Sequence, residues 1–160
     1  GIPFDTVDSL AGARGDWMVC AGLDFDALAG MMDEFRAVLA RGTSVLVLPP
    51  AAGTLPLPQK AFDRITLAGN QAVKDLDKRL DTAQWSGAGA GARMQLVPAG
   101  ETVTLRFAAD GAWSWVELHA GRARLVICGL DLAAHHRAHP APARIFERLF
   151  TRPSTHPKED

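Results

Sequence analysis

Three histidines near the carboxyl end are the first residues whose type and spacing suggest chemistry. His135 and His139 lie four positions apart and would share one face of a helix, with His136 beside them, and imidazole is a common metal ligand. Prolines crowd the segment, however, and Asp131 is the one nearby carboxylate that could complete a metal shell. The pattern favours surface histidines with no metal or other cofactor, and a metal-dependent hydrolase is the alternative.

Two tryptophans and a glutamate alternate along one apolar stretch. Trp113, Trp115 and Glu117 would lie on the same face of a strand. Indole rings cover the apolar faces of sugars, and a carboxylate accepts hydrogen bonds from sugar hydroxyls, but tryptophans in strands more often pack in a core or an interface. Asp131 follows the last predicted strand and could either brace its loop or contact a sugar. Both interpretations stay open.

Cys20 and Cys128 each lie within an apolar run. Free cysteine in such surroundings behaves as a small hydrophobic residue. We therefore expect two buried free thiols, with a disulfide or a reactive thiol as alternatives.

Length and composition indicate one soluble domain. The chain has 160 residues, enough for a single core, and a net charge of −1 that attracts neither nucleic acid nor an anionic membrane. No apolar run approaches the roughly 20 residues of a membrane span. The first residues, GIPFDTVDSL, lack signal-peptide features and begin a strand-like pattern at once, so we expect a piece of a longer protein whose compartment stays open.

Residues 17–48 give the clearest structural prediction. Trp17–Ala21 and Val45–Leu48 are continuous apolar runs of strand length, which is typical of strands covered on both faces. Between them lies an amphipathic helix that Asp24 or Asp26 can cap and that Gly42 ends. This strand, helix, strand unit predicts a parallel pair.

The segment after that second strand is where such folds place ligands. Pro49 and Pro50 end strand pairing, and residues 51–58 predict a proline-rich loop. A carbohydrate pocket could form from residues 49–58 together with three further side chains, namely Trp113, Trp115 and Asp131.

The remaining chain predicts mainly an antiparallel meander. The pattern weakens after Phe62, a helix begins at Asn70, and residues 86–92 form a glycine-rich loop. Strands are expected at 4–7, 94–97, 103–107, 113–118 and 124–128, a terminal helix at 142–150, and a flexible tail at 151–160. Residues 1–150 are thus predicted to form one domain.

Three stretches resemble the class I glutamine amidotransferase-like superfamily, which also contains DJ-1/PfpI-type proteins. They are DWMVCAGL at 16–23, RGTSVLVLPP at 41–50 and GRARLVICGLDL at 121–132. More narrowly, the chain is similar to amidotransferase-like domains within multidomain bacterial glycoside hydrolases of β-galactosidase type. The resemblance implies an α/β, three-layer flavodoxin-like sandwich with a mainly parallel central sheet and the antiparallel meander at its carboxyl end.

Active members of that superfamily carry a cysteine on a tight turn after the strand that matches residues 45–48, where backbone N–H groups form an oxyanion hole. Pro49 and Pro50 occupy this turn, and proline supplies neither a nucleophile nor an N–H group. The late-strand histidine and glutamate of glutaminases are also missing from residues 128–131. We therefore expect a degenerate active site with no catalytic residues.

The sequence favours a non-catalytic structural or interaction domain of a larger, carbohydrate-active bacterial protein. Its partners would be neighbouring domains of the parent chain, with a carbohydrate as a further ligand and neither nucleic acid nor membrane. A carbohydrate-binding module is the main alternative. The compartment of the parent stays open, with the periplasm and the cell exterior as the candidates, and the oligomeric state stays open as well.

Overall fold

The structure is a computed structural model that describes residues 5–48, 52–58, 62–68, 93–100, 102–135 and 140–151. The helical elements are the 3-10 turn η1 (Leu10–Gly12), α1 (Phe25–Gly30), α2 (Met32–Ala40), α5 (Leu132–His135) and α6 (Pro140–Thr151). The strands are β1 (Trp17–Ala21), β2 (Ser44–Leu48), β3 (Thr54–Pro58), β4 (Arg64–Ala68), β5 (Met94–Ala99), β6 (Thr102–Phe107), β7 (Trp115–Ala120) and β8 (Ala123–Cys128).

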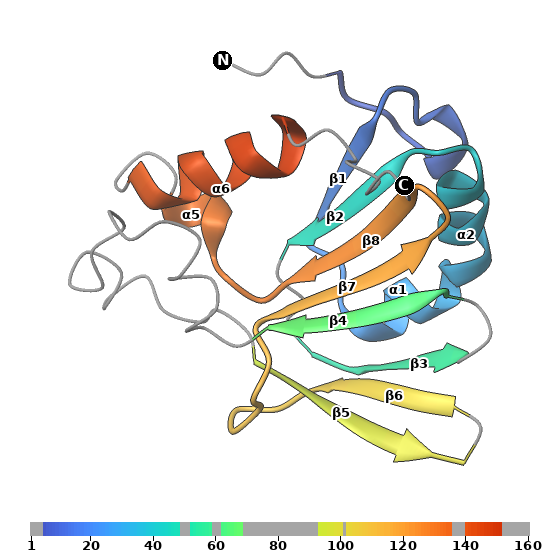
Figure 1. Ribbon diagram of the computed structural model, residues 1–160, viewed down its shortest axis with the longest axis vertical. Helices are drawn as coiled ribbons and strands as arrows, with labels where there is room; N and C mark the ends of the chain where they lie inside the picture. Colours follow the sequence, from blue (N-terminus) through green and yellow to red (C-terminus); the bar gives the residue numbers. More distant parts are fainter. Residues whose placement is uncertain are drawn as a thin grey trace, which may run out of the picture.

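The described strands form two sheets (Figure 1). The five-stranded sheet has the order β1-β2-β8-β7-β4, and the three-stranded sheet has the order β3-β6-β5. The described part of the chain is thus mostly β, with short helices. The predicted α/β, three-layer flavodoxin-like sandwich is wrong, because such a fold is rich in helices and has one central sheet.

The parallel unit at residues 17–48 is confirmed. β1 pairs with β2 in parallel, from Trp17 opposite Ser44 onward, and β2 pairs in parallel with β8. Asp24 caps α1 through its side chain, which accepts a 2.7 Å hydrogen bond from the N–H of Ala27. The predicted helix is divided at Met31 into α1 and α2, and Gly42, with a φ of +90°, stands after its end.

The strands of the predicted meander are divided between the two sheets. The prediction of a single central sheet is wrong for this reason. β6 pairs with β5 on one side and with β3 on the other, whereas β7 and β8 pair with each other in the five-stranded sheet, between β4 and β2. The alternating pattern of these residues predicts strands correctly. It contains no information on which strand pairs with which, because that depends on contacts distant in sequence.

The proline-rich segment after β2 is not wholly a loop, contrary to the prediction. Residues 54–58 form β3, which pairs only with β6 among the described strands. Pro56 therefore lies on an edge strand, where a missing N–H donor is tolerated. Residues 5–7 are not a strand, so the predicted strand at 4–7 is also wrong for its described part. The predictions for the helix from Asn70, for residues 86–92 and for most of the tail lie outside the described residues.

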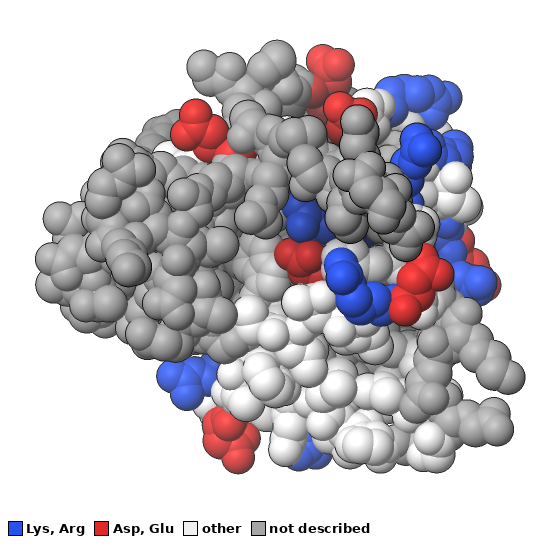
Figure 2. Space-filling model, in the orientation of Figure 1, with Lys and Arg blue, Asp and Glu red and all other residues white. Residues whose placement is uncertain are grey.

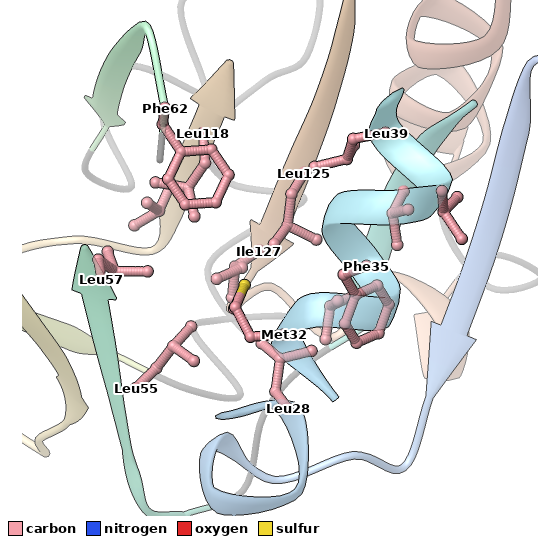
Figure 3. Close-up of a cluster of buried hydrophobic side chains, with 14 of the residues drawn as sticks. Leu28, Met32, Phe35, Leu39, Leu55, Leu57, Phe62, Leu118, Leu125 and Ile127 are labelled. Atoms are coloured by element: carbon pink, nitrogen blue, oxygen red, sulfur yellow. The ribbon is translucent and has the colours of Figure 1, made fainter. Parts of the chain in front are cut away.

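Side chains on the two faces of the five-stranded sheet pack into two cores. One core joins α1 and α2 to this sheet and also to the three-stranded sheet (Figure 3); its buried side chains include Phe25, Leu28, Phe35, Leu55, Leu57, Leu105, Leu118, Leu125 and Ile127. The other core joins α6 to the opposite face and includes Leu46, Leu48, Val126, Cys128, Ile145 and Leu149. The alternation of β2 and β8 residues between the cores explains their apolar sequences.

Candidate functional site

The segment between β6 and β7, residues 108–114, forms backbone hydrogen bonds with both sheets. On the three-stranded sheet, Met94 and Trp113 exchange two bonds, with N···O distances of 2.7 and 3.1 Å. On the five-stranded sheet, Ser114 N–H donates to the carbonyl of Ala68 at 3.1 Å, and Gly129 N–H donates to the carbonyl of Ser114 at 2.8 Å. The position of this segment is therefore fixed by strands that lie far apart in sequence.

Gly111 allows the segment to lie this close to β5. A Cβ atom built on Gly111 would stand 2.6 Å from the carbonyl oxygen of Met94 and 2.7 Å from its backbone nitrogen. These are backbone atoms and cannot swing aside as a flexible side chain would. Glycine is therefore required by the close approach of two chain segments.

A groove of about 340 Å³ opens at this junction. Its lining residues are Arg93, Asp110, Gly111, Ala112, Trp113 and Ser114. They bring together a guanidinium group, a carboxylate, an indole ring and a hydroxyl group. This volume is at the lower end of the range for small-molecule sites, which are mostly apolar with a few placed polar groups. We refer to it below as the junction groove.

Ser114 is the unusual residue of the junction groove. It is 1% exposed, and within the described chain its Oγ is a buried side-chain polar atom with no hydrogen-bond partner. A buried hydroxyl without a partner costs about 1–3 kcal/mol. Native proteins rarely keep such a group without a reason, so this hydroxyl marks a position that could contribute to binding.

Trp113 and Trp115, the two tryptophans considered as sugar contacts, lie in different surroundings. The prediction that they share a strand face is therefore wrong. Trp113 precedes β7, is half-buried against the core of α1 and α2, and lines the junction groove. Trp115 is 8% exposed and belongs to the core beneath α6. The isolated bridge from Trp113 to Met94 changes the course of the chain before β7 begins, which breaks the two-residue alternation.

The other predicted site residues do not join the junction groove. Asp131 lies between β8 and α5, is half-buried, and is not a lining residue. Pro49 and Pro50 lie outside the described residues. His136 and His139 also lie outside them, and His135 ends α5. In the part of the chain that the structure describes, no group of three or more metal-ligating side chains comes together.

A second polar cluster lies on the five-stranded sheet, where Glu117 accepts several hydrogen bonds. The indole Nε1 of Trp115 donates to its Oε1 at 2.9 Å, and Nη1 of Arg124 lies 3.1 Å from its Oε2. The Arg124 guanidinium carbon also stands 5.1 Å from the ring centre of Trp17, a cation–π distance. Glu117 therefore joins side chains of β7 and β8, and Arg124 extends the cluster to Trp17 on β1.

His119 extends this cluster toward β4. Its Nε2 lies 3.4 Å from Oε2 of Glu117 and 3.3 Å from Oγ1 of Thr66, and Nη2 of Arg64 lies 3.5 Å from its ring. Burial, and then the positive charge of Arg64, lower the pKa of His119 below 6.5, although Glu117 acts in the opposite direction. The neutral imidazole is thus the form that this cluster favours.

The sequence contains signals for part of both clusters. Alternation at Trp115, Glu117 and His119 could have placed the second cluster on one face of β7. Arg93 and Ser114 carried no comparable signal. Their proximity depends on how two sheets meet, and no local pattern specifies that.

Both cysteines are poor nucleophiles in this structure. Cys20 on β1 and Cys128 on β8 are free thiols. Burial raises the pKa of Cys20 to about 11 and that of Cys128 to about 12. Since the thiolate is the reactive form, both side chains behave as small apolar residues at neutral pH, and the predicted free, buried state is confirmed for Cys128 while Cys20 is only partly buried.

The charged side chains on the face drawn in Figure 2 have both signs and lie interspersed among the described residues. In the described part of the chain, no helix is long and apolar enough to cross a membrane. Comparisons of the chain with protein-family models, with curated proteins and with solved structures found no match.

Proposed function

We propose that this chain is a non-catalytic structural or interaction domain of a larger, carbohydrate-active bacterial protein. The superfamily that the sequence resembles acts through a cysteine on the turn where this chain has Pro49 and Pro50. The state of the two thiols elsewhere in the chain is the structural observation that supports the non-catalytic part. Cys20 and Cys128 are kept protonated by burial, with pKa values of about 11 and about 12. The resemblance supplies the larger context, and the parent would act in the periplasm or outside the cell.

Alkylation by iodoacetamide tests this part directly. At pH 7 we expect both thiols of the folded chain to react far more slowly than the same thiols in guanidinium chloride, because the thiolate fraction is minute and access is restricted. Mass spectrometry of tryptic peptides reads each cysteine separately. A cysteine that is alkylated in the folded chain as fast as a free thiol would refute the proposal.

The free edge of β1 supports the interaction part. Among the described strands β1 pairs only with β2, so one row of its backbone groups has no strand partner. Val19, in the middle of β1, is 48% exposed, although it belongs to an apolar strand. Exposed strand edges of this kind readily pair with another segment. A neighbouring domain of the parent protein is the partner that we propose.

Hydrogen–deuterium exchange compares the chain alone with the chain inside its parent protein. We expect the amides of β1 to be protected more strongly in the parent. Val19→Lys places a charge on the edge and should abolish the added protection, whereas Val7→Lys, at an exposed position outside the sheet, is the matched control. Equal protection of β1 in both proteins would remove the proposed interface.

The alternative of a carbohydrate pocket in the segment after β2 finds no support in the described residues. Residues 54–58 are occupied in strand pairing with β6. Asp131, Trp113 and Trp115 also lie in three different surroundings, so they do not form the single pocket that was expected.

A further inference from the structure

The charged groups of the junction groove are available for a ligand. In the described chain neither Arg93 nor Asp110 forms an ion pair or a side-chain hydrogen bond, although both line the same groove. Their backbone is held in place by β5 and by the turn before β7, where Ala108 N–H donates to the carbonyl of Arg93 at 2.9 Å. The groove thus offers one cationic donor and one anionic acceptor from a fixed frame.

Trp113 gives the groove an apolar wall. Its backbone is fixed to Met94 by two hydrogen bonds, and its half-buried ring packs partly against the core. A ring held in this way needs no further ordering when a ligand binds, so little conformational entropy is lost. Indole rings stack well on the C–H faces of sugars because those faces are apolar.

Ser114 adds a second, independent indication of a ligand. Its Oγ is buried and has no partner within the described chain, yet Ser114 lines the groove. Because Oγ itself is buried, a ligand reaches it only when the Ser114 side chain turns toward the groove, where the hydroxyl can donate or accept a hydrogen bond.

We propose that the junction groove binds a neutral sugar residue through Arg93, Asp110, Trp113 and Ser114. The carboxylate of Asp110 disfavours an anion, and the guanidinium of Arg93 disfavours a cation. A sugar hydroxyl, by contrast, can donate to the carboxylate and accept from the guanidinium group. The groove volume of about 340 Å³ suits a ligand of this size. This site does not depend on the interaction role proposed above.

The larger groove at the end of α2 is a weaker candidate. It measures about 820 Å³ and is lined by Arg36, Arg41 and Arg122 together with two aspartates. Arg36 is already paired with the exposed Asp33, and Arg41 donates to the carbonyl of Leu10. The carbonyl end of α2 also lies there, which opposes anion binding.

The test is an NMR titration of the whole chain with D-galactose, D-glucose, D-mannose and lactose, with glucuronate and glucosamine as charged probes. The chain has four tryptophans, so four indole N–H signals report at once. Trp113→Phe assigns the relevant signal. We expect at least one neutral sugar to shift the Trp113 signal in a saturable way and to leave the Trp115 signal unchanged.

Three variants locate the site. Ser114→Ala should weaken binding about fivefold, the equivalent of one ordinary hydrogen bond, without lowering the melting temperature, since its hydroxyl has no partner in the free chain. Arg93→Gln should weaken binding by about five- to tenfold. Arg122→Gln, at an exposed arginine in the other groove, is the matched control and should bind like the unmodified chain.

The outcomes separate clearly. No shift of the Trp113 signal with any neutral sugar overturns the proposal. Binding of glucuronate or glucosamine alone overturns the neutral class of ligand. If both Ser114→Ala and Arg93→Gln leave sugar binding unchanged, the proposed location of the site is overturned. Trp17 and Trp115 signals at the positions of the unmodified chain verify that each variant is folded.

Discussion

At the scale of single residues, Glu117 is the side chain on which most polar contacts converge. It accepts hydrogen bonds from Trp115 and Arg124 and lies beside His119, while its own side chain is 15% exposed. A carboxylate so placed compensates for its burial through charge-assisted bonds, which are stronger than neutral ones. Its removal leaves the donor groups of Trp115 and Arg124 without their acceptor.

Glu117→Ala is therefore expected to lower the free energy of unfolding by about 2–4 kcal/mol, because it breaks a partly buried, charge-assisted network. Urea denaturation at pH 7 measures the change. Asp33→Ala provides the control, since Asp33 is 98% exposed and its ion pair with Arg36 spans 3.5 Å; that variant should stay within about 0.5 kcal/mol. Equal losses in the two variants would contradict the role given to Glu117.

His119 makes stability depend on pH in a definite direction. Its pKa is lowered in the folded chain, so between that value and the unfolded value near 6.5 the unfolded chain binds more protons. The contribution of neutral His119 to the free energy of unfolding is fully present above pH 6.5. It is lost as the pH falls from 6.5 through the lowered pKa of the folded chain. Acid thus protonates the imidazole and favours unfolding.

His119→Gln should remove this part of the pH dependence. As the pH falls from about 7 to 5, we expect the free energy of unfolding of the unmodified chain to fall more steeply than that of the variant. Denaturation series at closely spaced pH values provide the comparison. Parallel curves for the two proteins would show that His119 titrates identically in both states.

At the scale of elements, the close packing of the 108–114 segment on β5 is the contact that positions the junction groove. Gly111 sits there without space for a Cβ atom, whereas Gly30 at the end of α1 has nothing within 4 Å of that position. Neither residue carries an unusual backbone angle in the left-handed region. Neither glycine is thus required by a left-handed backbone, and the space available for a Cβ atom is what distinguishes the expected effects of substitution.

Gly111→Ala is expected to destabilise the chain by about 1–3 kcal/mol through overpacking against the Met94 backbone. Gly30→Ala should be neutral or stabilise by up to about 1 kcal/mol, since alanine restricts the unfolded chain. Melting temperatures of the two variants give the test. A destabilising Gly30→Ala with a harmless Gly111→Ala would reverse the packing argument.

Local patterns predict many of these elements but not their assembly. The helix from Asp24 and the strands around it were predictable because caps, apolar periodicity and Gly42 all act within a few residues. β3 was missed because its prolines oppose strand pairing except at an edge, and edge position is a property of the whole sheet. The junction groove was missed for the same reason, apart from Trp113, since its residues meet only where two sheets do.

At the scale of the whole molecule, the five-stranded sheet is shared by both cores. Leu46 on β2 belongs to the core beneath α6, whereas Leu125 on β8 belongs to the core beneath α2, and both are fully buried. Neither core can lose its packing without exposing the sheet that supports the other. The described residues should therefore unfold as one cooperative unit.

Leu46→Ala and Leu125→Ala are each expected to cost about 2–5 kcal/mol. Both should shift the unfolding transitions seen by circular dichroism and by tryptophan fluorescence to the same extent, because the two probes report one transition. Val19→Ala, at a half-exposed position on the same sheet, should cost much less. Transitions that separate in one leucine variant would show that the cores unfold independently.

The pairing of β2 with β8 also governs the order in which the molecule can form. The backbone N–H of Arg124 donates to Oγ of Ser44 across 80 residues of sequence, so the centre of the sheet closes a very long loop. Such contacts slow folding, because chain entropy is lost before the contact forms. During synthesis the unit of β1, α1, α2 and β2 emerges before β8, so the edge of β2 that β8 will cover is unpaired at first. The sheet is completed only after β8 has also left the ribosome, which exposes that edge of β2 to misassociation in the interval.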